Sequence, residues 1–161
     1  MKKQKTAFLT KAAIIAALYV VLTMLANALG LANLAIQVRF SEALTILPVF
    51  TGAAVPGLFV GCIISNLISG CVIWDVIFGS LATLIGALAT YALRKRKLLP
   101  YLPPIISNAL IVPFVLVYAY GIEGTLWFFM LTVGIGEVVS CGVLGYILRR
   151  TLERYGSGIK W

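Results

Sequence analysis

The sequence predicts an all-α integral membrane protein, a bundle of six transmembrane helices with both termini on the cytoplasmic side. Of its 161 residues, 61% are hydrophobic and 11% are charged, whereas about a quarter of the residues in soluble domains are charged. The apolar residues form long runs, and each helical span consumes about 20 residues. We therefore expect one membrane-embedded domain, residues 1–161, in a multi-pass protein of the plasma membrane.

The net charge of +8 gathers in three basic clusters at the ends of apolar runs. The clusters are Lys2, Lys3, Lys5 and Lys11; Arg94, Lys95, Arg96 and Lys97; and Arg149, Arg150 and Arg154. Lysine and arginine in short loops beside spans mark the cytoplasmic side. All three clusters are therefore predicted to face the cytoplasm, and this distribution favours a lipid bilayer over a nucleic acid as the partner of the positive charge.

The first three predicted helices differ in length. The six helices are expected at residues 7–29, 41 to 50 or 52, 57–68, 75–93, 105–120 and 125–152. The first would be about 34 Å long at about 1.5 Å per residue, enough to cross a hydrocarbon core of about 30 Å. The second is short and contains Pro48, so a tilt or break is expected. A turn around Pro56 precedes the third, where Gly57 and Gly61 permit a close helix approach.

The last three predicted helices are separated by proline and glycine. Asp75 opens the fourth helix, which runs inward to the second basic cluster. Pro100, Pro103 and Pro104 then break the chain before the fifth helix. Pro113 is expected to kink that helix, because proline removes a backbone hydrogen bond. A glycine-bounded turn at 121–124 leads into the sixth.

Three acidic side chains are the main candidates for substrate binding. Glu137 lies near the middle of the last predicted helix, and Glu42 and Asp75 stand in the first turns of the second and fourth. Ionisable groups within spans are costly and commonly face an interior or a cavity. The structural alternatives are an interhelical hydrogen bond for Glu137 and stabilisation of helix N-termini by Glu42 and Asp75.

Arg39, Asn66, Asn108 and Trp74 complete the predicted substrate site. Arg39 stands three residues before Glu42, in a stretch expected to form one wall of the site, although the two could simply form an ion pair. The asparagine side chains offer donors and an acceptor to a flat heterocycle, or hydrogen bonds between helices. Trp74 would stack on a planar ligand or belong to the interfacial aromatic belt.

A partner surface is predicted on the first helix. Ala12 and Ala16, and also Ala13 and Ala17, form two A-x-x-x-A pairs. Small residues four apart let another helix approach closely. That helix belongs either to the same bundle or to a separate membrane partner.

Several enzyme classes lack support. The chain has no histidine, which removes H-E-x-x-H zinc sites and Ser/His/Asp triads, and it has no G-x-x-x-x-G-K-[ST] loop for ATP. Cys62, Cys71 and Cys141 show no metal-binding spacing and are interpreted as small apolar fillers. We expect no enzyme activity, no cofactor and no metal; an intramembrane enzyme using carboxylates as acid and base is a weak alternative.

Three stretches carry a family resemblance: VRFSEALTILPVFTGAAVPGLFVGC at 38–62, WDVIFGSLATLIGAL at 74–88 and GEVVSCGVLG at 136–145. Together with the six predicted spans, they resemble the QueT family of queuosine-precursor transporters, which are substrate-binding S components of energy-coupling factor (ECF) transporters. The resemblance implies uptake of queuine or another 7-deazaguanine from outside the cell. It also implies a transmembrane coupling protein and two ATPases as partners, with the alanine pairs of the first helix contacting the coupling protein.

The substrate chemistry is compatible with these residues. A guanine-like edge presents an N–H and an amino group side by side, and one carboxylate, Glu137 or Glu42, can accept both. Two alternatives stay open: an S component for another vitamin-like substrate, and a stand-alone secondary transporter in which Glu137 is a proton site. The small size and the lack of repeated halves count against the second.

Overall fold

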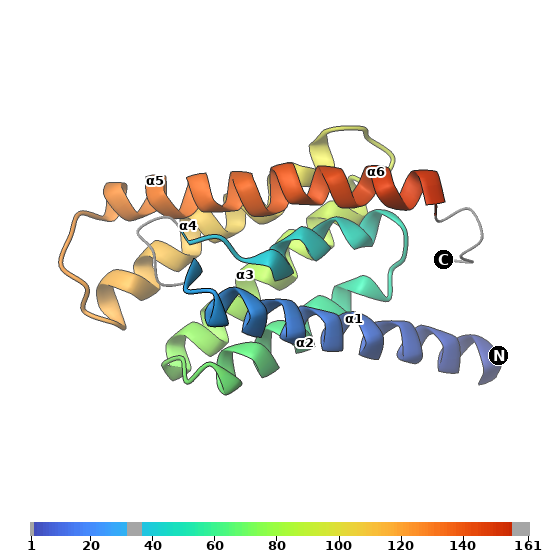
Figure 1. Ribbon diagram of the computed structural model, residues 1–161, viewed down its shortest axis with the longest axis horizontal. Coiled ribbons are helices and arrows are strands. Elements are labelled where there is room, and N and C mark those ends of the chain that lie inside the picture. Colours follow the sequence, from blue (N-terminus) through green and yellow to red (C-terminus); the bar gives the residue numbers. More distant parts are fainter. Residues whose placement is uncertain (1, 32–36, 156–161) are drawn as a thin grey trace.

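The computed structural model describes residues 2–31 and 37–155, and all regular elements within these ranges are helical (Figure 1). They are α1 (Lys2–Ala28), the 3-10 helix η2 (Phe40–Val49), α2 (Ala54–Ile68), α3 (Ile73–Ala92), the 3-10 turn η3 (Leu99–Tyr101), α4 (Leu102–Tyr118), α5 (Leu126–Glu137), the π-helical segment η4 (Val138–Leu144) and α6 (Gly145–Tyr155). Because η3 runs into α4, and α5, η4 and α6 are continuous, the described residues form six helical stretches. Each stretch overlaps one predicted helix.

Four of these stretches are long and apolar enough to cross a membrane. They are Lys3–Ala28, Ile73–Ala92, Leu99–Tyr118 and Leu126–Tyr155. Their outward faces carry many exposed large apolar side chains, as expected of helices that contact lipid. The protein is therefore a membrane protein. Because η2 and α2 are shorter, six membrane crossings stay a prediction.

The prolines begin helices more often than they break them. Pro56 lies in the first turn of α2 and not in a turn ahead of it, so that part of the prediction is wrong. Pro103 and Pro104 likewise lie in the first turn of α4. The missing N–H of proline costs nothing there, because the first N–H groups of a helix have no partner within the helix. Pro113 lies inside α4 and is buried.

The close approach predicted at Gly57 and Gly61 is confirmed, and α1 is the partner helix. A Cβ atom at Gly57 would lie 2.7 Å from the carbonyl oxygen of Ala12, and one at Gly61 would lie 3.0 Å from that of Ala16. The first alanine pair therefore packs within the bundle. Ala13 and Ala17, on the neighbouring face of α1, are exposed.

The short helix η2 lies inside the bundle and contacts α1, α2, α3, η4 and α6. Seven of its ten residues are buried, and its Leu44 and Leu47 join Tyr19 and Leu58 in the apolar core. A 3-10 run longer than three or four residues is uncommon. At membrane depth, such a backbone is tolerated where protein surrounds it, and η2 meets that condition.

The bundle has two distinguishable ends. The start of α1 and the end of α6 lie at one end, which we call the terminal end, and the turn after α3 lies toward it beside α6 (Figure 1). The end of α1, the turn between α2 and α3, and the turn after α4 lie at the opposite, distal end (Figure 1). The basic clusters thus share one side of the bundle as predicted, while its cytoplasmic assignment stays a prediction.

Candidate functional site

A polar vestibule of about 420 Å³ opens at the distal end. This volume is within the usual range for small-molecule pockets, about 300–1,000 Å³. Three predicted site residues line it: Arg39, Asn66 and Asp75. Six further polar or thiol side chains also line it: Thr23, Asn27, Gln37, Ser69, Cys71 and Tyr120. These residues come from four helices or their ends and from the segment before η2, so the vestibule exists only when the bundle is assembled.

Asp75 is held at the vestibule wall by partners from other helices. Its Oδ2 atom accepts a 2.9 Å hydrogen bond from the Tyr120 hydroxyl, which follows α4. Asn66 of α2 donates a 3.4 Å hydrogen bond to the Asp75 carbonyl. Gly79, one turn along α3, leaves the space beside both side chains, since a Cβ there would lie 3.1 Å from Asp75 Oδ1. Asp75 thus lines the vestibule, and its carboxylate makes no capping hydrogen bond at the start of α3.

Arg39 is the cation of the vestibule. Burial disfavours its charged form, but Tyr19, Asp75 and Glu42 together raise its pKa above its ordinary value. Its Nη2 donates a long 3.5 Å hydrogen bond to Gln37, and within the described residues no carboxylate lies within 4.0 Å of it. The alternative of a simple Arg39–Glu42 ion pair is therefore not realised, and most guanidinium N–H groups remain available to a ligand.

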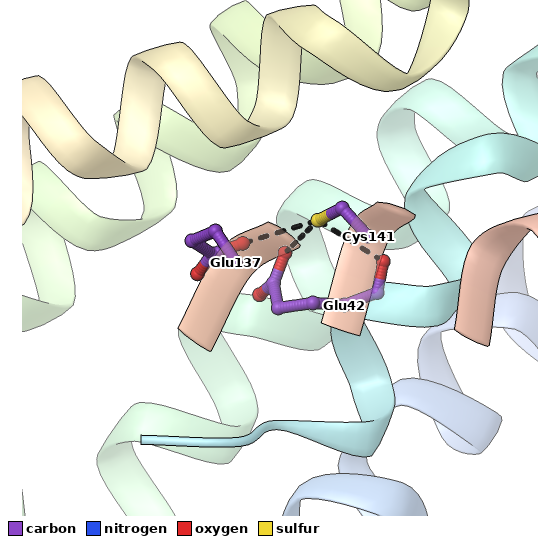
Figure 2. A group of neighbouring side chains, drawn as sticks. All are labelled: Glu42, Glu137 and Cys141. Carbon is purple, nitrogen blue, oxygen red and sulfur yellow. Dashed lines mark hydrogen bonds between the residues drawn. The ribbon is translucent and has the colours of Figure 1, made fainter. Parts of the chain in front are cut away.

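Deeper in the bundle, Glu42 and Glu137 flank the thiol of Cys141 (Figure 2). The Cys141 sulfur lies 3.1 Å from Glu137 Oε2 and 4.0 Å from Glu42 Oε2. The two carboxyl groups and the thiol are all buried. We call these three residues the carboxylate cluster.

Two neighbouring side chains adjoin the cluster. The Tyr19 hydroxyl of α1 donates a hydrogen bond to Glu42 Oε1, and the Asn108 side chain of α4 lies near both carboxyl groups. The sequence prediction that Glu42, Glu137 and Asn108 contribute to one polar site is consistent with this arrangement. The hydrogen bond of the Glu137 side chain to Cys141 lies within one helical stretch, so the alternative of an interhelical hydrogen bond for Glu137 stays a prediction.

The unusual helix types position the cluster. In a 3-10 helix, residues three apart lie in line, so Glu42 and Thr45 of η2 both face Cys141, with the Thr45 hydroxyl 3.4 Å from its sulfur. On the opposite side, Glu137, Ser140 and Cys141 all face η2, and the Ser140 hydroxyl accepts a 3.1 Å hydrogen bond from the Arg39 backbone N–H. Arg39 therefore connects the vestibule with the cluster.

The donor atoms of Glu42, Glu137 and Cys141 lie within 4.8 Å of one another, so a metal ion could be held there in principle. The sequence predicts no metal. Each of these groups already has a hydrogen-bond partner in the described structure.

Two groups of predicted residues lie elsewhere. Trp74 is about half exposed and stacks with Phe78, where it borders an apolar groove between α3 and α4, away from the vestibule. Its position agrees with the interfacial alternative. Of the four alanines predicted to contact a partner, Ala12 and Ala16 pack on α2 within the bundle. Ala13 and Ala17 are exposed.

Sequence reasoning missed Tyr19, Tyr120 and the two site cysteines, Cys71 and Cys141. Tyr19 was detectable: Ala12, Ala16, Tyr19 and Thr23 repeat at helical spacing and mark the inward face of α1. Cys141 lies four residues after Glu137 and so shares its face. Tyr120 and Cys71 carry no comparable signal, because they lie in turns beyond helix ends.

A bundle of apolar helices that encloses a polar vestibule and buried carboxyl groups has the architecture of a membrane protein that handles a small polar solute. The family model of the QueT transporter matches residues 9–154, and the chain belongs to this family. The resemblance found in the sequence is thereby confirmed, and membership of a transporter family favours transport over catalysis. No curated protein and no solved structure matches the chain.

Proposed function

We propose that the chain is the substrate-binding S component of an ECF importer in the plasma membrane and takes up queuine or a 7-deazaguanine precursor. The vestibule faces the outside of the cell and receives the substrate. The family match and the presence of both Arg39 and Asp75 in the lining of one cavity of about 420 Å³ support this proposal.

The vestibule residues complement a guanine-like edge. Such an edge presents a carbonyl oxygen followed by an N–H and an amino group. Asp75 accepts the two N–H donors as a charge-assisted pair, and Arg39 donates to the carbonyl oxygen. Asn66 and Gln37 also border the cavity and supply amide donors and acceptors to the rest of the heterocycle. Glu42 and Glu137 do not line the vestibule but lie in the carboxylate cluster beside Cys141.

As the family resemblance implies, the proposed partners are a transmembrane coupling protein and two ATPases; the chain itself has no G-x-x-x-x-G-K-[ST] loop for ATP. Within the two alanine pairs, Ala13 and Ala17 are the exposed ones. They leave a smooth face on α1 against which a partner helix packs closely.

Calorimetric titration of the detergent-purified chain tests the proposal. The ligands are queuine, its 7-cyano and 7-aminomethyl precursors, guanine, and a 7-deazaguanine analogue that lacks the 2-amino group. We expect tight binding of one 7-deazaguanine and much weaker binding of the analogue. Without the 2-amino group, one oxygen of the Asp75 carboxylate would have no hydrogen-bond donor from the ligand. Absence of binding to every deazaguanine would redirect the search to riboflavin, thiamine and biotin.

A matched pair of variants locates the site. Asp75→Asn should weaken binding by about 10- to 100-fold, the effect of losing a hydrogen bond to a charged group. Glu123→Gln removes a carboxylate from the exposed turn after α4 and should leave binding unchanged. Equal effects of the two substitutions would exclude Asp75 from the site.

The carboxylate cluster favours a second candidate, a stand-alone proton-coupled transporter. Two buried carboxyl groups that share a thiol, with no cation within 4.0 Å of them among the described residues, are suited to hold one proton between them. This candidate requires the purified chain alone to move the substrate into proteoliposomes when a pH gradient is imposed. Uptake that depends on the coupling protein, the ATPases and ATP would exclude it.

A further inference from the structure

A second polar pocket lies at the terminal end of the bundle, away from the vestibule. Its volume is about 400 Å³, and it lies between α6 and the segment that runs from the turn after α3 to η3. Lys97, Tyr101, Tyr146, Arg149 and Arg150 contribute its polar lining, together with Glu153. None of these residues takes part in the vestibule or in the carboxylate cluster.

The pocket carries an excess of positive charge. Three cations and one carboxylate line it, which leaves two positive charges in excess. Glu153 pairs with Arg149 at 2.7 Å. Lys97 and Arg150 have no carboxylate within 4.0 Å among residues 2–31 and 37–155, so their charges favour binding of an anion from outside the chain.

The two arginines are oriented by contacts within the protein. Arg149 Nη1 donates a 2.8 Å hydrogen bond to the carbonyl of Lys97, which joins the turn to α6. Arg150 Nε donates a 3.0 Å hydrogen bond to the Tyr146 hydroxyl, and its guanidinium lies 5.3 Å from the centroid of that ring. The remaining N–H groups of Arg150 form a planar fork, a geometry that matches phosphate oxygens.

An apolar groove begins beside this pocket. Leu98 lines the pocket, and the next residue, Leu99, lines a groove of about 470 Å³ between α3 and α4. Ile85 and Ala89 of α3 and Ile106 of α4 line it further along, and these residues lie in candidate membrane spans. The basic pocket at the end of the spans therefore adjoins an apolar groove within them. Together they match the two parts of a phospholipid, its charged headgroup and an acyl chain.

We propose that this pocket binds the phosphate of an anionic phospholipid, with an acyl chain in the Leu99 groove. Basic pockets between transmembrane helices are known to bind anionic headgroups. The inference does not rest on the identity of the transported substrate. It assigns a specific lipid site to the terminal end of the protein.

Thermal unfolding of the full chain in neutral detergent tests the proposal, with added phosphatidylglycerol, phosphatidylcholine, glycerol phosphate or inorganic phosphate. Of these four additives, only phosphatidylglycerol should raise the melting temperature. Lys97→Gln with Arg150→Gln should weaken its effect about tenfold or more. Lys95→Gln with Arg96→Gln is the matched control, since it removes two charges from the same turn outside the pocket, and it should bind normally.

Other outcomes would overturn the proposal. Equal loss in both double variants would mean that the attraction is general electrostatics and not a site. Equal stabilisation by inorganic or glycerol phosphate would identify a free-anion site with no role for the groove. If the Lys97/Arg150 variant bound lipid normally but no longer co-purified with the ATPases, the surface would be a protein-docking site. Unchanged helical circular dichroism and unchanged Cys71 labelling would establish that the variants are folded.

Discussion

The hydroxyl of Tyr120 donates a 2.9 Å hydrogen bond to Oδ2 of Asp75, although the two residues are 45 positions apart in the chain. This contact fixes the turn after α4 to the start of α3 at the mouth of the vestibule. Because it also orients the carboxylate, Tyr120 is a positioning residue for the proposed substrate.

Tyr120→Phe should therefore weaken binding of the 7-deazaguanine about 3- to 15-fold, the range expected for one hydrogen bond, without abolishing it. Calorimetry of the purified variant measures the effect. Tyr118→Phe is the matched control, because Tyr118 is largely exposed and stacks on Phe114. A loss of affinity in the control as large as in Tyr120→Phe would contradict the positioning role.

Cys71 provides a native chemical reporter of the vestibule, because Cys62 and Cys141 are buried. Burial, and then the negative charge of Asp75, raise the pKa of the Cys71 thiol. Since the thiolate is the reactive form, alkylation by a membrane-impermeant maleimide should require a higher pH than that of a free thiol. Bound substrate should slow the reaction, and Cys71→Ser should abolish it.

Two substitutions should move this pH profile in opposite directions. Asp75→Asn removes a charge that opposes the thiolate, so labelling of Cys71 should shift to lower pH. Arg39→Gln removes a charge that favours the thiolate, so labelling should shift to higher pH. Shifts of the same sign would show that these charges do not act on Cys71 as the structure indicates.

Tyr19→Phe should destabilise the protein by about 1–3 kcal/mol, because it leaves a buried carboxyl oxygen of Glu42 without its donor. Denaturant unfolding in detergent measures this loss. The cost should shrink when Glu42→Gln is already present, since interacting residues give non-additive effects. Full additivity of the two substitutions would argue against the contact.

Gly61→Ala should destabilise the bundle by about 1–3 kcal/mol through overpacking. The added Cβ would lie 2.8 Å from the Cβ of Tyr19 and 3.0 Å from the backbone oxygen of Ala16, so α1 and α2 would have to separate. Gly134→Ala is the control, because its nearest neighbour across the interface is the Cβ of Ala109 at an ordinary 3.8 Å. Similar unfolding midpoints for the two variants would contradict the tight contact.

Ala13→Leu combined with Ala17→Leu should preserve substrate binding and abolish uptake by the assembled importer. Both side chains are exposed, so the bundle tolerates leucine there, whereas a closely packed partner helix does not. Radiolabelled uptake and calorimetry separate the two effects. Ala28→Leu, exposed at the other end of α1, should affect neither, and normal uptake by the double variant would remove α1 from the partner surface.

Runs of hydrophobic residues were sufficient to place one predicted helix on each helical stretch, because lipid requires long apolar stretches with satisfied backbone hydrogen bonds. They did not distinguish helix types. The 3-10 form of η2 and the π form of Val138–Leu144 depend on contacts with several other helices, and such tertiary contacts leave no local signature. Similarly, Pro56 fits a turn and the first turn of a helix equally well.

For the site, residue chemistry identified candidates but not their grouping. Arg39 and Asp75 line one cavity, while Glu42 and Glu137 lie together beside Cys141 and outside its lining. This grouping depends on how the helices pack, which residue type does not encode. The same limit applies to the two alanine pairs. One pair packs on α2 and the other is exposed, and this depends on which face of α1 meets Gly57 and Gly61.

The helix type of η2 also sets how far its ten residues reach. At about 2.0 Å per residue a 3-10 helix of this length covers about 20 Å, a distance for which an α-helix needs about 13 residues. Removing or adding one residue would rotate the following part by about 120° relative to Glu42. This short stretch should therefore have a fixed length among related proteins that share the site, even where its individual side chains vary.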